Sequence, residues 1–108
     1  MMNELEWQQW RQQGAGHAAA AAFLLLDVQT NLAMLDILQA RLDKLRADPD
    51  AEPYALSGNS YFVQLGPRQV LIEALYGDDI EPVTLDLDDF RDALGYWRVR
   101  IEADGDFE

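Results

Sequence analysis

Acidic side chains are the residues of this chain whose number and spacing suggest chemistry. The 108 residues hold 20 Asp and Glu against 8 Lys and Arg, one His and no Cys, which gives a net charge of −12. Two carboxylates placed together can act as general acid and general base, and several can bind a metal ion. The absence of cysteine excludes thiolate zinc sites, disulfides and cysteine nucleophiles.

The positions of the carboxylates argue against catalysis. Asp78, Asp79 and Asp88 fall where we expect a solvated loop or the first turn of a helix, whereas acid–base chemistry needs carboxyl groups that are buried or converge across a cleft. The acidic segment 48–53 lacks the central Gly and the closing Glu of a calcium loop, and His17 is the only histidine. No P-loop, dinucleotide fingerprint or nucleophile elbow is present. The sequence therefore predicts a protein that is not an enzyme and has no metal site and no cofactor.

The distribution of charge indicates a protein partner instead. Residues 1–46 hold five acidic and four basic side chains, whereas residues 47–108 hold fifteen and four, a balance of −11. Such a half repels nucleic acid and anionic lipid and attracts a basic protein. The alternative is that the charges serve solubility alone.

Two groups of residues are candidates for binding this partner. On the last predicted helix, Asp88 and Asp92 point away from the apolar stripe, and we expect them to share one rim with the acidic turn that precedes the third strand. Near the N-terminus, two tryptophans three residues apart either close the core or form an exposed aromatic anchor. The candidate partner-binding residues are Asp78, Asp79, Glu81, Asp88, Asp92, Trp7 and Trp10.

The middle of the chain alternates with the period of a β-strand. Apolar residues fall two apart in 61–65, in 70–76 and again in 83–87. Gly66-Pro67-Arg68 between the first two runs is typical of a hairpin. We therefore expect a three-stranded antiparallel meander over residues 59–87.

A helical spacing follows the strands. Asp86 is placed to cap a helix over residues 88–103, and acidic residues in its first turn complement the helix dipole. The apolar residues of this helix stand three, four and seven apart, so one stripe should be buried. The stripe consists of Phe90, Ala93, Leu94, Trp97 and Ile101.

The N-terminal half predicts a long helix. Residues 17–46 contain neither Pro nor Gly and are rich in Ala and Leu, which favour helix, and residues 1–16 form an N-terminal arm with a short helix. The apolar residues of the long helix recur at spacings of four and three, as in a coiled-coil seam that joins two copies. Asn31 either pairs across such a dimer or lies at a solvated edge. The seam residues are Leu24, Val28, Asn31, Leu35, Leu38 and Leu42.

These elements predict one α+β domain over residues 1–108, with both main helices on one face of the sheet. The apolar run 18–26 is too short to cross a bilayer and lacks the flanks of a signal peptide. We expect a cytoplasmic protein that binds neither a membrane nor nucleic acid.

The C-terminal part resembles a known class of bacterial proteins. The segment from Val70 to Arg100, with Asp78-Asp79, Val83 to Phe90 and Ala93-Leu94-x-x-Trp97-Arg98, is similar to the C-terminal part of small immunity proteins. The resemblance implies an inhibitor that neutralises a cognate toxin, as in contact-dependent inhibition and other polymorphic toxin systems. The segment from Asn31 to Asp36, together with the same C-terminal elements, also resembles the uncharacterised YacL-like family, which implies no function.

Two functional hypotheses follow. The first is a non-catalytic inhibitor, an immunity protein whose acidic half binds a basic toxin domain. The second is a self-associating structural or adaptor protein that forms a homodimer through the long helix.

Overall fold

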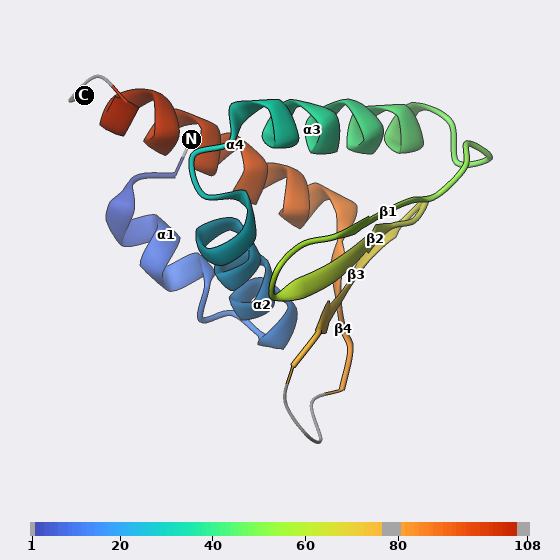
Figure 1. Ribbon diagram of the computed structural model, residues 1–108, viewed down its shortest axis with the longest axis horizontal. Helices are drawn as coiled ribbons and strands as arrows, with labels where there is room; N and C mark the ends of the chain where they lie inside the picture. The colour runs from blue at the N-terminus through green and yellow to red at the C-terminus, as the bar shows by residue number, and fades with distance from the viewer. Residues whose placement is uncertain (1, 77–80, 106–108) are drawn as a thin grey trace.

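The computed structural model describes residues 2–76 and 81–105 of the chain. It is an α+β fold in which helices lie on one side of a four-stranded antiparallel sheet and leave its other face uncovered (Figure 1). The helices α2 (Ala15–Phe23), α3 (Leu32–Ala47) and α4 (Leu87–Gly105) all contact strands of this sheet. The prediction of an α+β fold with the helices on one face of the sheet is confirmed.

The sheet is a meander with one strand more than predicted. Its strands are β1 (Tyr54–Ser57), β2 (Tyr61–Leu65), β3 (Gln69–Ala74) and β4 (Val83–Asp86), paired in chain order. The prediction of three strands is wrong because it missed β1, and the meander begins at residue 54 rather than 59. β1 has four residues and is only half-buried on its inner side, which is too short a run for alternation to be recognised.

The register of the strands divides their side chains between two faces. Val63 lies opposite Ile72, and Leu65 lies opposite Val70, which in turn lies opposite Leu85. All five side chains are buried against the helices. Because side chains alternate along a strand, the residues between them point to the uncovered face.

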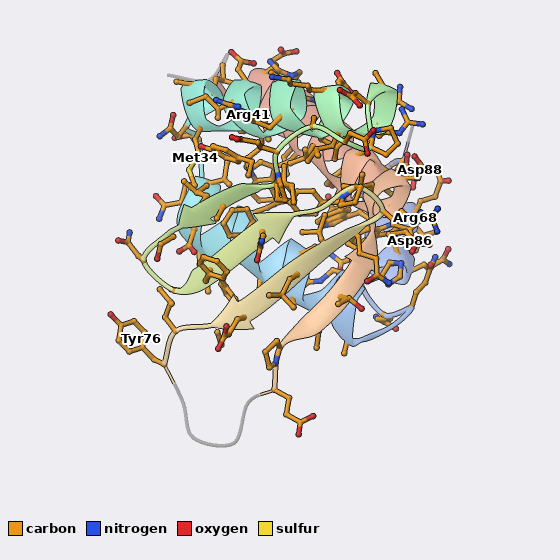
Figure 2. All side chains as sticks on the ribbon, turned by 90° about the vertical axis from the view of Figure 1, so that its right-hand side faces the viewer. Met34, Arg41, Arg68, Tyr76, Asp86 and Asp88 are labelled. Carbon is orange, nitrogen blue, oxygen red and sulfur yellow. The ribbon has the colours of Figure 1, made fainter. Side chains whose placement is uncertain are left out.

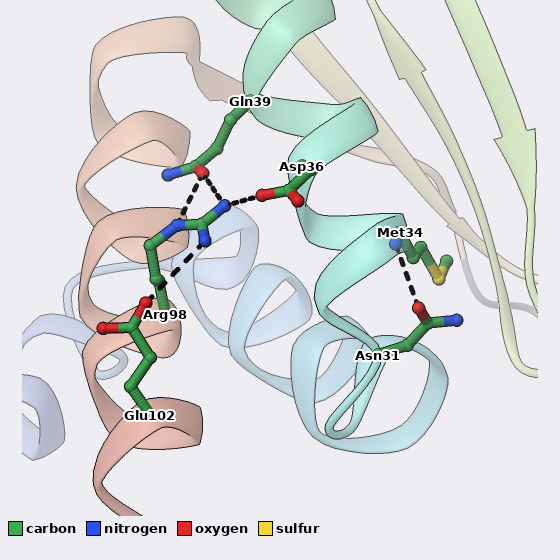
Figure 3. Close-up of polar contacts among 6 residues, drawn as sticks. All are labelled: Asn31, Met34, Asp36, Gln39, Arg98 and Glu102. Carbon is green, nitrogen blue, oxygen red and sulfur yellow. Dashed lines mark hydrogen bonds and ion pairs between the residues drawn. The ribbon is translucent and has the colours of Figure 1, made fainter. Parts of the chain in front are cut away.

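The prediction of one long helix over residues 17–46 is wrong. The chain forms α2 (Ala15–Phe23), a π-helical turn η1 (Leu24–Val28) and a separate helix α3 (Leu32–Ala47). Gln29 between them has φ of 53°, a left-handed conformation that interrupts any helix. The Asn31 side chain accepts a hydrogen bond from the backbone N–H of Met34 at 3.0 Å and so caps α3 (Figure 3).

Contacts with distant segments hold this break in the helix. The indole Nε1 of Trp97 donates to the backbone oxygen of Gln29 at 2.7 Å. The two carboxylate oxygens of Asp27 accept from the backbone N–H groups of Ser60 and Tyr61, each at 2.9 Å. Tertiary hydrogen bonds therefore overrule the helix propensity of the Ala- and Leu-rich sequence.

The two ends of the chain pack together. The N-terminal arm contains α1 (Glu4–Trp10), which begins with a capping box between Asn3 and Glu6. The last helix, α4, spans Leu87–Gly105 and includes the predicted 88–103, and its apolar stripe is buried as expected. Arg98 of α4 hydrogen-bonds Gln39 and forms an ion pair with Asp36, both on α3 (Figure 3).

Candidate functional site

The acidic residues predicted to form one rim are separated by a strand. Asp78 and Asp79 lie outside the described residues. Glu81 is exposed before the start of β4, whereas Asp88 and Asp92 follow its end on α4. The four residues of β4 span about 13 Å. The described members of the predicted rim therefore lie at opposite ends of β4, and the prediction that they share one rim is wrong.

Asp88 has a cationic partner that the sequence did not reveal. Its Oδ1 lies 2.7 Å from Nε of Arg46, at the end of α3. The sequence showed no sign of this pair, because Arg46 is 42 positions away from Asp88 along the chain. Figure 2 places Asp88 beside Arg68 and Asp86 at the end of the sheet. Arg46 offsets the charge of Asp88, so Asp88 contributes little to an acidic surface.

Asp92 remains exposed and lies at a concave surface. It lines a hollow of about 560 Å³ between α1 and α4, together with Glu6, Arg91 and Tyr96. Asp92 has no ion-pair partner within residues 2–76 and 81–105. We name this surface, formed by Met2, Glu6, Arg91, Asp92, Gly95 and Tyr96, the α1–α4 hollow.

Trp7 and Trp10 are part of the core rather than an exposed anchor. Their exposed fractions are 2% and 6%, and their rings stack with centroids 5.1 Å apart. Trp7 also stacks on Tyr96 of α4 at 4.4 Å. Trp10 in turn packs against His17 of α2. Because both rings are buried, the alternative in which they form an exposed aromatic anchor for a partner is wrong.

A hydrogen bond between a tyrosine and a carboxylate closes this aromatic cluster. The Tyr96 hydroxyl donates to Oε2 of Glu4 at 2.7 Å, and the Arg100 guanidinium lies 3.8 Å from the same oxygen. The hydrogen bond from Tyr96 lowers the pKa of Glu4, with further contributions from Gln8 and Arg100. Burial raises the pKa of Tyr96, and the bond to Glu4 raises it further. At pH values above the lowered pKa of Glu4, the hydrogen bond between Tyr96 and Glu4 therefore attaches α1 to α4.

The predicted dimer seam belongs to the interior of one chain. Leu24, Leu35, Leu38 and Leu42 are fully buried, and Val28 is 1% exposed. Asn31 is exposed and caps α3. The apolar seam residues are therefore covered by the protein itself, and the prediction that they form a dimer seam is wrong.

The uncovered face of the sheet is a surface that the sequence analysis missed. Gln64 of β2, Leu71 of β3 and Thr84 of β4 line a hollow of about 680 Å³ on this face, with Arg68 at its edge. Figure 2 looks onto this side of the molecule, with Arg68 and Asp86 at one end. The alternation of polar and apolar residues between the buried positions was the signal, since Phe62 and Leu71 fall on this side.

The site closest to acid–base chemistry is small. His17 Nε2 lies 3.3 Å from Oδ2 of Asp89, outside hydrogen-bond geometry, and the imidazole meets the Trp10 ring edge-on at 4.7 Å. A hollow of about 180 Å³ adjoins this pair. Across residues 2–76 and 81–105, no group of three or more His, Asp or Glu is placed to hold a metal ion.

The comparisons with known proteins find no relative. No protein-family model, no curated protein and no solved structure matches this chain. In the described part of the chain, no helix is both long and apolar enough to cross a membrane.

Proposed function

We propose that this protein is a non-catalytic inhibitor that binds a basic protein, and specifically an immunity protein that neutralises a toxin in the cytoplasm. The observation that carries the proposal is that Glu6 and Asp92 are exposed at the α1–α4 hollow, beside Arg91, and form no ion pair within the described residues. A net charge of −12 supplies long-range attraction for a basic partner.

The ion pairs of the described residues use basic groups that would otherwise offset this charge. Arg46, Arg98 and Arg100 are each paired with carboxylates of other elements. Asp92 keeps its charge exposed and unpaired within the described residues. These ion pairs thus hold the helices together, and the Asp92 carboxylate is available to bind a basic group of a partner.

The shape of the α1–α4 hollow supports a docking role. Asp92 and Glu6 line it from two different helices, together with Arg91 and the 7% exposed Tyr96. Two carboxylates suit the ammonium or guanidinium group of a partner. We therefore assign the partner's basic side chain to the α1–α4 hollow.

Co-expression tests the proposed inhibition. We expect the protein to restore growth of cells that produce a basic toxin encoded beside its gene, and to co-elute with that toxin on size-exclusion chromatography. Asp43→Lys, a charge reversal at an exposed site on α3, should still protect the cells, whereas Asp92→Lys should protect them less. A neighbouring gene whose basic product neither impairs growth nor binds the protein would contradict the proposal.

A further inference from the structure

The uncovered sheet face carries an apolar centre. Register and alternation place Phe62 and Gln64 of β2, Leu71 and Glu73 of β3, and Thr84 of β4 on this side. Phe62 and Leu71 are half-buried by their neighbours on the sheet. Leu75, which follows β3 on the same side, is 41% exposed. Since a sheet face with these residues is stabilised by being covered, it is a candidate interface.

The charge of this face also favours contact with a second copy. The strands contribute two acidic side chains to it, Glu73 and Asp86, and the β2–β3 turn contributes the basic Arg68. It is therefore close to neutral in a chain whose net charge is −12. Two copies with that charge repel each other less across this face than across an average part of their surface.

The order of residues through the end of the β2–β3 turn and along β3 is complementary to itself. Arg68, Leu71 and Glu73 give a positive, an apolar and a negative position in sequence. Two such faces can stack about a two-fold axis that lies between them, passes beside Leu71 and is perpendicular to β3. The two β3 strands are then antiparallel. This arrangement places Arg68 of one copy opposite Glu73 of the other, and the reverse pair as well.

The side chains have the reach that this arrangement needs. Packed sheets lie about 10 Å apart, a gap that an arginine and a glutamate extended toward each other can bridge. Arg68 and Glu73 are both exposed, and neither has an ion-pair partner within the described residues. Both are therefore available for pairing between copies.

We propose that a second copy of this chain covers the uncovered sheet face, in a two-fold dimer joined by two Arg68–Glu73 ion pairs around Leu71 and Phe62. This inference is independent of the proposed inhibitor function, which uses the α1–α4 hollow. Four strands of four to six residues form a face of roughly 19 by 17 Å. Such a small interface is typical of weak association, so we expect a reversible dimer that forms only at high protein concentration.

Sedimentation equilibrium between about 10 and 500 µM protein tests the dimer. We expect the average mass to rise toward that of two chains with increasing concentration. Arg68→Glu or Glu73→Arg alone should weaken association about tenfold, because each sets like charges opposite each other. The double variant Arg68→Glu/Glu73→Arg should recover association to within about threefold of the wild type, because it restores both pairs with reversed sign.

A matched control separates pairing from net charge. Arg91→Glu changes the charge as Arg68→Glu does, but it lies on α4 at the α1–α4 hollow, and it should leave association within about twofold. A chain that stays monomeric at every concentration overturns the dimer. So does a double variant that remains as weak as the single ones, or an Arg91→Glu variant as weak as Arg68→Glu.

Discussion

A single carboxylate, Asp27, joins the helical layer to the sheet. It lies in η1 and accepts two backbone N–H groups from the β1–β2 turn, 33 and 34 residues along the chain. Asp27→Ala leaves both groups without this acceptor, and hydrogen bonds to charged groups contribute 1.5 to 3 kcal/mol each. We expect urea unfolding to give a loss of about 3 kcal/mol or more. The matched change Asp43→Ala, on the exposed side of α3, should cost less than about 0.5 kcal/mol.

Gly58 in the same turn is restricted by Asp27. A Cβ at this position would lie 2.4 Å from Oδ2 of Asp27, closer than side chains approach one another. Gly58→Ala should therefore destabilise the protein, and it should do so less in the Asp27→Ala background, where the obstructing carboxylate is gone. A double-mutant cycle measures this coupling, which we expect to reach about 1 kcal/mol. Strictly additive costs would refute the contact.

Tyr96→Phe tests the pairing of α1 with α4 through its pH dependence. Since the Tyr96 hydroxyl holds the pKa of Glu4 below 4.5, the pairing stabilises the fold above that pH, and its contribution is lost as pH falls through the lowered pKa. In an NMR titration, the Tyr96→Phe variant should show a higher Glu4 pKa than the wild type. Its free energy of unfolding should fall less than that of the wild type as the pH drops through the lowered pKa. Gln8→Ala, which removes a lesser contribution, should raise the pKa less. An unchanged Glu4 pKa in Tyr96→Phe would contradict the assignment.

At the scale of elements, the break between α2 and α3 predicts the sign of a mutation. Asn31→Ala removes the N-cap of α3 and should cost about 1 kcal/mol of stability. In an uninterrupted helix the same change would stabilise the protein, because Ala favours helix more than Asn does. A gain in stability of Asn31→Ala in chemical denaturation would contradict the break and support one long helix. Asp43→Ala, within α3, is the control for propensity and should be neutral or slightly stabilising.

Local patterns were enough to predict some elements and not others. The hairpin at Gly66-Pro67-Arg68 and the apolar stripe of α4 follow from turn chemistry and from a long repeated period. The break at Gln29 has no Gly or Pro to announce it, and the contacts that hold it come from Trp97, 68 residues away. β1 is likewise identified by its pairing with β2 rather than by its four residues. Contacts with other segments decided both features that the sequence did not predict, the break at Gln29 and β1.

At the scale of the whole molecule, the sequence could predict only those features of the candidate site that depend on a single helix. The exposure of Asp92 follows from its angular position on α4. The pairing of Asp88 with Arg46 and the burial of Trp7 against Tyr96 depend on how α3 and α1 dock on α4. Helical period alone carries no information on those neighbours. The proposed partner-binding surface is therefore the α1–α4 hollow rather than the predicted rim.

The salt dependence of partner binding is the measurement that tests the proposed function most directly. Titration calorimetry with the basic protein encoded beside this gene, at low and high salt, should show affinity that falls as salt rises. Asp92→Lys should weaken low-salt binding about tenfold and reduce the salt dependence, while Asp43→Lys stays within about twofold of the wild type. Equal affinity and equal salt dependence for Asp92→Lys and Asp43→Lys would contradict recognition through the α1–α4 hollow and leave solubility as the role of the acidic surface.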